Sequence, residues 1–350
     1  MPEELLLRVE NLVKHFPVAD ATTGRRHGAL LRAVDGVSFQ LAAGETLGLV
    51  GESGCGKSTL AQTLLRLVEP TSGKVYYRGQ DVYSMSRKEL KDFRKKVQVV
   101  FQDPFESLNP RKTVGQIIAE PWTIHRDLVP RAQWRSRAAE LLELVGLHPQ
   151  HIDRYPGQFS GGQRQRIGIA RAVAVQPDLL ICDEPVSALD VSVQAQILNL
   201  IQDIQHELGL GVIFISHDLG VVRHISDRIG VMYLGRMMEY GAESDVFERP
   251  RHPYTEALIS SVPVPRSERD TAPARRILAG DLPSPVNPPS GCRFRTRCWK
   301  AVDICADREP TPRAHADEHS HVACHFPAHS ARLHPDPLAN PQPLEVNPHV

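Results

Sequence analysis

The sequence predicts an α/β fold with a mostly parallel sheet, a helical insertion and an irregular C-terminal extension. Three observations support this prediction. Residues 1–250 alternate between short apolar segments, typical of buried strands, and amphipathic segments, typical of helices. The strand-like segments stop between about 103 and 160. After residue 250 the chain becomes rich in Pro, Arg and His and this periodicity ends.

The individual elements follow from local patterns. Short apolar runs bounded by turn residues predict four strands, namely ETLGLV (45–50), KVQVVF (96–101), LLICDE (179–184) and GVIFIS (211–216). Helical spacing over 192–208 predicts a helix with an apolar face, formed by Val193, Ile197, Leu200, Ile201, Ile204 and Leu208. Within the insertion, a further helix is predicted to begin at Pro130 and to end at Gly146.

Composition excludes several classes of protein. Lys plus Arg equals Asp plus Glu, at 41 each, so the chain lacks the basic charge of a nucleic-acid-binding protein. No run of eighteen apolar residues predicts a membrane span. The start, MPEELLLRVE, lacks the basic region of a secretory signal. We therefore expect a reducing compartment, in which disulfides are uncommon.

The segment GESGCGKS (51–58) has the spacing G-x-x-x-x-G-K-[ST] of a phosphate-binding P-loop. It lies between a predicted strand and a helix-like segment, and this context disfavours a glycine-rich loop without a ligand. Its glycines let backbone N–H groups turn toward phosphate oxygens. Lys57 is expected to contact the β- and γ-phosphates and Ser58 to ligate Mg²⁺. The expected nucleotide-binding residues here are Gly51, Glu52, Ser53, Gly54, Cys55, Gly56, Lys57, Ser58 and Thr59.

The segment LLICDEP (179–185) is an apolar strand that ends in two carboxylates. Two acids at the end of a buried strand are costly unless they meet a cation or water. Asp183 fits a residue that holds Mg²⁺, and Glu184 fits a general base that polarises the attacking water. Alone, a solvent-exposed strand end would be the better explanation of the pair; together with the P-loop, the functional interpretation is favoured.

The segment FSGGQRQRIGIARA (159–172) is the third motif. With the two others, it resembles the signature of the ATP-binding subunits of ABC transporters, although Phe159 stands where Leu is commoner. The resemblance implies a P-loop ATPase core over 1–102 and 166–250, with an antiparallel β part at its N-terminus. It implies a helical signature subdomain over 103–165.

The resemblance also implies roles for single residues. Gln102, in VVFQDP, would join Ser58 and Asp183 around Mg²⁺, and His217, in FISHD, would act with Glu184 on the γ-phosphate. Phe16 would stack on adenine, with core packing as its alternative. The residues expected to meet a second subunit are the signature residues Ser160, Gly161, Gly162 and Gln163 and the D-loop residue Asp190.

The segment RHPYTEALISSVP (251–263) resembles the element that follows the ATPase core in oligopeptide and dipeptide importers. The resemblance is closest to the second of their two ATPase subunits. It implies an ATP-hydrolysing translocase subunit, closing as a heterodimer with another ATPase subunit on two transmembrane permeases, at the cytoplasmic face of the bacterial cell membrane. A substrate-binding protein would be an indirect partner, and no nucleic acid is expected. A nickel importer and a non-transport ATPase with a metal-binding tail remain alternatives.

Four of the six cysteines, Cys292, Cys298, Cys305 and Cys324, lie in the extension, assigned to 251–330. Their spacing lacks the C-x₂₋₄-C of zinc knuckles. The importer resemblance implies a 4Fe–4S cluster, with zinc or free thiols as alternatives. We expect Arg293, Arg295 and Arg297 to offset the charge of the cluster. The cluster is expected to replace a hydrophobic core and to take no part in ATP chemistry.

The other two cysteines need no ligand role. Cys55 occupies a variable position of the P-loop, and Cys182 lies in an apolar strand, where a cysteine acts as a small core residue. At the end of the chain, residues 331–350 are expected to form a disordered tail.

Overall fold

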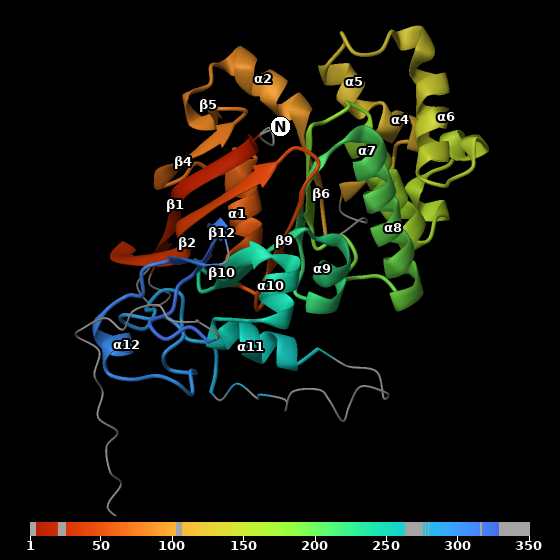
Figure 1. Ribbon diagram of the computed structural model, residues 1–350. Helices are drawn as coiled ribbons and strands as arrows, with labels where there is room; N and C mark the ends of the chain where they lie inside the picture. The colour runs from red at the N-terminus through yellow and green to blue at the C-terminus, as the bar shows by residue number, and fades with distance from the viewer. Residues whose placement is uncertain are drawn as a thin grey trace, which may run out of the picture.

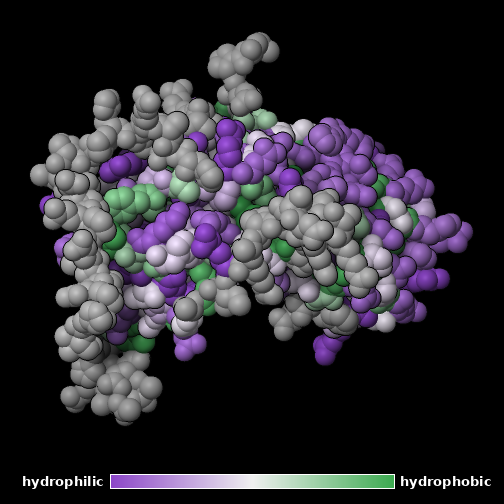
Figure 2. Space-filling view, turned by 60° about the horizontal axis from the view of Figure 1, so that its bottom comes forward, coloured by the Kyte–Doolittle hydropathy of each residue, from purple (hydrophilic) through white to green (hydrophobic). Residues whose placement is uncertain are grey.

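The computed structural model describes most of the chain, in the ranges 5–19, 26–102, 107–262, 280–315 and 317–328, with residues 276 and 278. The tail predicted over 331–350 lies outside the described residues. Within the described ranges, no helix is both long and apolar enough to cross a membrane. Figure 2 shows one face of the molecule, where hydrophobic residues form small patches among hydrophilic ones.

The fold is built on an eight-stranded sheet in the order β11-β12-β10-β9-β3-β8-β7-β6. Five neighbouring strands, from β9 to β6, run parallel, and β10, β12 and β11 continue the sheet antiparallel. The four predicted strands are confirmed to within one residue at each end. The strands are β3 (Thr46–Val50), β6 (Val97–Val100), β7 (Leu179–Asp183), β8 (Gly211–Ile215), β9 (Arg228–Tyr233), β10 (Arg236–Ala242), β11 (Arg313–His315) and β12 (Asp317–Val322).

A second, antiparallel sheet forms the N-terminal part, as predicted, in the order β2-β1-β4-β5. Its register pairs apolar residues across strands, for example Val9 with Phe39, so that one face packs on the core. Figure 1 shows this sheet at the left of the molecule. The strands are β1 (Leu5–Ala19), β2 (Arg26–Ala42), β4 (Ser72–Tyr77) and β5 (Gln80–Asp81).

Helices surround the two sheets. The α-helices are α1 (Lys57–Leu64), α2 (Arg87–Lys96), α4 (Val114–Ile118), α5 (Glu120–Ile124), α6 (Trp134–Leu144), α7 (Gly161–Val173), α8 (Val191–Leu208), α9 (Leu219–Ile225), α10 (Glu243–Glu248), α11 (Pro253–Ser260) and α12 (Ile304–Asp307). The 3₁₀ helices are η1 (Val82–Ser84), η2 (Arg131–Gln133), η3 (Pro149–Asp153) and η4 (Pro156–Gln158).

The predicted helical insertion is confirmed, and Figure 1 shows α4, α5 and α6 together at one end of the molecule, next to α7. The helix expected to begin at Pro130 starts as η2, and its α-helical part begins at Trp134. The chain leaves it at Gly146, whose φ of 71° is the left-handed conformation that ends many helices. Buried Trp122 anchors the insertion, because its Nε1–H donates to the Ala174 carbonyl after α7 at 2.9 Å.

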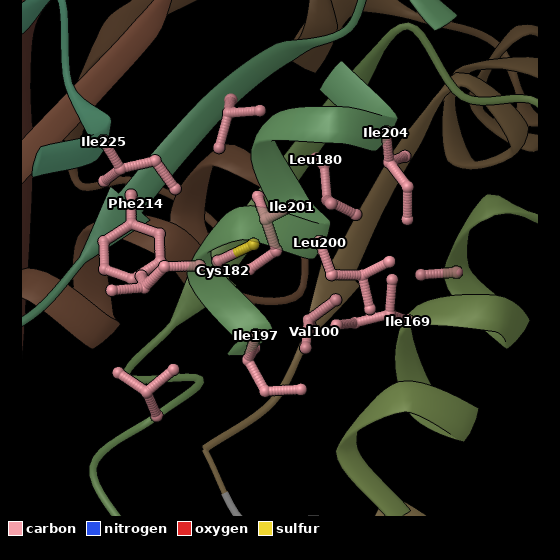
Figure 3. Packing of buried hydrophobic residues seen from close by; sticks show 14 of the residues in the cluster. Val100, Ile169, Leu180, Cys182, Ile197, Leu200, Ile201, Ile204, Phe214 and Ile225 are labelled. Atoms are coloured by element: carbon pink, nitrogen blue, oxygen red, sulfur yellow. The ribbon is translucent and has the colours of Figure 1, made fainter. Parts of the chain in front are cut away.

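The central strands β3, β7 and β8 of the large sheet are buried on both faces, and their side chains alternate between the two faces. In β7, Leu180 and Cys182 join a cluster with Ile197, Leu200, Ile201 and Ile204 of α8, as Figure 3 shows. Leu208, expected on the same apolar face, is instead exposed near the end of the helix. Leu179 and Ile181 point the other way, into a cluster shared with the N-terminal sheet. Cys182 is fully buried and burial raises the pKa of its thiol, which confirms its interpretation as a core residue.

The C-terminal extension is joined to the core. Strand β12 pairs with β10, with Glu239 opposite Val322, so the extension lengthens the large sheet. Phe294 is fully buried and belongs, with Cys292 and Cys305, to the cluster around α8. The expectation that a metal cluster replaces a hydrophobic core here is therefore wrong: the extension shares the core of the preceding domain.

Candidate functional site

The P-loop connects β3 to α1 in a backbone conformation that only glycine adopts easily. Gly56 has a φ of 111°, and a Cβ there would lie 1.9 Å from the Ala33 carbonyl oxygen. Gly51 has a φ of 152°, and its Cβ would lie 2.1 Å from the Met232 carbonyl oxygen. The tight approach of neighbouring backbone thus explains why the motif requires these glycines.

Lys57, the first residue of α1, is almost fully buried inside the loop. Its Nζ donates to the carbonyl oxygens of Gly51 at 2.7 Å and Glu52 at 3.3 Å. Within the same loop Ser53 and Gly54 are exposed, whereas Cys55 is buried and burial raises the pKa of its thiol. In these two hydrogen bonds the lysine ammonium is therefore bound by carbonyl oxygens and not by a carboxylate.

Ser58 and Asp183 meet beside the loop. The Ser58 hydroxyl donates to Asp183 Oδ1 at 3.1 Å, which joins the first turn of α1 to the carboxyl end of β7. Burial raises the pKa of Asp183, the Ser58 hydrogen bond opposes that rise, and the neighbouring Glu184 carboxylate adds to it. A hydroxyl and a carboxylate oxygen are the ligand types that Mg²⁺ prefers, so the pair fits a magnesium site.

Three predicted residues converge at the ends of neighbouring parallel strands. Gln102 Nε2 donates to Glu184 Oε2 at 3.3 Å, and His217 Nδ1 lies 3.2 Å from the same oxygen. They follow β6, β7 and β8, whose carboxyl ends meet at one edge of the sheet. Glu184 has a φ of 47°, a conformation unusual for a non-glycine residue, and its N–H donates to the Ile215 carbonyl at 2.9 Å.

Phe16 lies on β1 and is half-buried, with Lys14 Nζ 4.8 Å from its ring centroid. Among the residues that the structure describes, it is not part of either of the two buried clusters. A half-exposed ring remains available for stacking on a flat ligand.

The signature residues form the start of α7. Ser160 is the N-cap of the helix, and it exchanges hydrogen bonds with Gln163 in a capping box. Gly162 packs against α8 so closely that a Cβ would lie 2.3 Å from Val193 Cγ1. Asp190 is exposed at the start of α8. These residues thus share a rigid corner between α7 and α8.

Two residues of the C-terminal extension make contacts with the P-loop that were not expected from the sequence. The Glu52 N–H donates to the Tyr254 hydroxyl at 3.0 Å. Arg297 Nη1 donates to both carboxylate oxygens of Glu52, at 2.9 and 2.8 Å. Glu52 occupies a variable position of the motif, and its partners are 202 and 245 residues away in sequence, so no local pattern could indicate these contacts.

The four cysteines of the extension lie near one another. Cys292 and Cys305 are buried, and Cys298 and Cys324 are partly buried. Burial raises the pKa of Cys324 to about 12, and the thiols of Cys292, Cys298 and Cys305 add to the rise. In the ranges that the structure describes, no three or more His, Cys, Asp or Glu side chains are arranged as a metal site. The four thiols therefore lie near one another but are not in the geometry of a metal-binding site.

Two of the three arginines between Cys292 and Cys298 are paired with carboxylates of the preceding domain. Arg293 is buried and donates to the carboxylate of Asp35 and the carbonyl of Leu234. Arg297 pairs with Glu52. The expectation that both offset the charge of a cluster is wrong, because each is paired with a carboxylate of the core.

Comparison with known proteins agrees with this geometry. The family profile described as "ABC transporter" matches residues 34–187. The dimeric ATP-binding cassette MJ0796 in a post-hydrolysis state bound to ADP and Pi has a TM-score of 0.60 and 28% identity, covering 68% of this chain and 99% of its own. CbiO1 from Clostridium perfringens, part of the ABC transporter complex cbiONQ, also has a TM-score of 0.60, with 29% identity, covering 71% and 92%. The fold is that of an ABC-type ATPase.

The extension identifies the branch of that family. Residues 238–305 match the profile "Oligopeptide/dipeptide transporter, C-terminal region". The oligopeptide transport ATP-binding protein AppF of Bacillus subtilis is 53% identical, over 93% of this chain and 98% of its own length. OppF of Haemophilus influenzae is 50% identical, over 92% and 97%. The chain therefore belongs to the ATP-binding proteins of ABC transporters, in the oligopeptide transport branch.

Proposed function

We propose that this chain is the ATP-hydrolysing subunit of an ABC importer for di- or oligopeptides. The observation that carries the proposal is the convergence of Ser58–Asp183 and of Gln102, Glu184 and His217 on one edge of the sheet beside the P-loop. The close relatives named as oligopeptide transport proteins, and the matching C-terminal region, support a peptide cargo.

ATP binding is assigned to the P-loop and Phe16. The backbone N–H groups of 54–59 and the start of α1 favour phosphate oxygens, and Lys57 adds a positive charge. Ser58 and Asp183, with Gln102, would hold Mg²⁺, which supplies positive charge that stabilises the phosphates in the transition state. Phe16 would stack on the adenine ring.

Hydrolysis is assigned to Glu184 and His217. The Glu184 carboxylate is the base that orients and polarises the attacking water. Gln102 and His217 contact the same carboxylate oxygen, so they hold it in place and report the state of the γ-phosphate to the loops that follow β6 and β8.

The signature corner is assigned to a second subunit. Ser160, Gly161, Gly162 and Gln163 present a helix N-terminus, which favours the phosphates of an ATP bound to a partner chain. Asp190 would lie at that interface. ATP then stabilises a closed dimer and hydrolysis releases it, because only the closed form has both surfaces on the nucleotide. The dimeric MJ0796 structure supports such pairing, and we propose a heterodimer with a second ATPase subunit.

The remaining assignments concern the assembly. We place the chain at the cytoplasmic face of the cell membrane, on two permease subunits that receive cargo from a substrate-binding protein. Residues 1–102 and 166–250 would be the ATPase core, 103–165 the helical signature subdomain, and 251–330 the importer extension. A nickel importer would use the same machine.

A distinct proposal is that the cysteines hold a 4Fe–4S cluster. Four convergent thiols are a suitable donor set, and they would have to draw together to form the cage. Anaerobic purification followed by iron and sulfide assays tests it. We expect about four of each per chain; a colourless protein with stoichiometric zinc, or with no metal, would contradict the cluster.

Purification of the intact complex tests the transporter assignment. A tagged chain should bring down two membrane proteins and a second ATPase. A stand-alone ATPase or a regulator would be recovered without them, and full ATPase activity in the absence of any partner ATPase would contradict the proposal.

A further inference from the structure

We infer that Arg297 and Tyr254 are positioning residues for the P-loop, through which the C-terminal extension raises the affinity for ATP. The inference rests on the proposed function of the loop as the ATP site. It gives residues of the extension a part in ATP binding, whereas the expectation from sequence was only that the cysteine cluster takes no part in ATP chemistry.

Glu52 is the point of contact. Its N–H is bound by the Tyr254 hydroxyl, and both of its carboxylate oxygens are bound by Arg297. The Arg297 side chain is 9% exposed and the Glu52 side chain 26%, so water screens this pair only partly. The extension thus binds both the N–H and the carboxylate of Glu52, the second residue of the loop.

The charge of Glu52 explains why the pair matters. A carboxylate in a loop that binds phosphate repels the ligand, because like charges at short range raise the energy of the bound state. Arg297 neutralises that charge directly. Burial alone would lower the pKa of Arg297, but the Glu52 carboxylate and the Tyr233 hydroxyl outweigh burial and raise it, so the guanidinium stays charged.

Tyr254 is held rigidly enough to position the loop. Its ring centroid lies 4.7 Å from that of Tyr233 on β9 and 5.3 Å from that of Phe294 in the extension. All three rings are fully buried. The hydroxyl that accepts from Glu52 is therefore fixed by the core and the extension together.

A second link reaches the other part of the loop. Arg293 donates to the Leu234 carbonyl, and the next residue, Gly235, donates its N–H to the Cys55 carbonyl at 2.8 Å. The extension thus reaches the loop at Glu52 directly and at Cys55 through one turn. A glycine-rich loop loses much conformational freedom when it is ordered. Contacts that order it before ATP arrives raise the apparent affinity.

The experiment uses the full-length chain and measures the dissociation constant of a non-hydrolysable ATP analogue. Arg297→Met should weaken binding about tenfold, as expected for a charge-assisted pair. In the assembled transporter its KM for ATP should rise by a similar factor with little change in kcat. Arg295→Met is the matched control, because Arg295 donates to Ser290 within the extension, and its binding should stay within about twofold of wild type.

Two further variants separate positioning from a general loss of structure. Arg297→Lys, which keeps the charge, should restore part of the affinity. Glu52→Gln combined with Arg297→Met should bind more tightly than Arg297→Met alone, because the unneutralised carboxylate is gone. If Arg297→Met does not fold, Tyr254→Phe, which removes only the hydroxyl, should still weaken binding.

Three outcomes would overturn the inference. The first is that the Arg297→Met and Arg295→Met variants bind the analogue with equal affinity. The second is that adding Glu52→Gln to Arg297→Met does not tighten binding. The third is that Tyr254→Phe binds the analogue as tightly as wild type. If any of these three results is found while the wild-type chain binds the analogue, the proposed function still stands and only this inference is refuted. Failure of the wild-type chain to bind the analogue would instead refute the proposed function, and this inference with it.

Discussion

At the scale of the residue, the centre of the site is a carboxylate in a constrained position. Glu184 has a positive φ, and Gln102 and His217 both contact its Oε2 atom. Such conformations cost energy and persist where the surrounding structure determines them. Here the backbone hydrogen bond to Ile215 and the two side-chain contacts hold Glu184 in this conformation.

Another carboxylate, Glu239, gives a prediction of pH dependence. It is fully buried on β10 and accepts the N–H groups of Arg251 and His252, each at 2.9 Å. Burial raises its pKa from 4.5 to about 7, against these hydrogen bonds. The folded state therefore binds a proton that the unfolded chain releases above about pH 4.5, so stability falls as pH rises toward 7.

The measurement is the free energy of unfolding between pH 5 and 7 for wild type and Glu239→Gln. The residue should account for a fall on the order of 3 kcal/mol across its whole titration range. The variant should show a flatter pH dependence whatever its absolute stability. Parallel curves for the two proteins would show that Glu239 does not titrate there.

At the scale of the element, the signature helix allows a matched comparison. Ser160 at the start of α7 and Ser86 at the start of α2 both form capping boxes. Ser160→Ala and Ser86→Ala should each cost about 1 kcal/mol of stability through loss of the cap. In the assembled transporter only Ser160→Ala should also lower ATP hydrolysis, by more than about tenfold. Equal hydrolysis rates for the two variants would remove Ser160 from the ATP site.

The elements that sequence predicted are those with a strong local pattern. Strands β3, β6, β7 and β8 are short apolar runs, and α8 has clear helical spacing. Strands β11 and β12 were missed because they are short, polar segments that are stabilised by pairing with each other and with β10. Strand β10, which joins this pair to the large sheet, is far away in sequence, and the residues of β11 and β12 carry no strand signal of their own.

At the scale of the whole molecule, the parts of the site that were predicted are local segments, and the parts that were missed are contacts between distant segments. The P-loop and Asp183–Glu184 were predicted because each motif is a contiguous segment with its own chemistry, whereas His217 was implied by the family resemblance. The contacts Arg297–Glu52 and Arg293–Asp35 join residues 245 and 258 positions apart. Only the folded chain brings them together, and they join the extension to the preceding domain.

The central claim is that this chain hydrolyses ATP within a peptide importer. The most direct test is phosphate release by the purified transporter complex, with and without peptide-loaded binding protein, for wild type and Glu184→Gln. We predict peptide-stimulated hydrolysis by wild type, and a Glu184→Gln complex that binds ATP normally but loses nearly all turnover. Normal turnover by Glu184→Gln, or hydrolysis indifferent to peptide, would contradict the account.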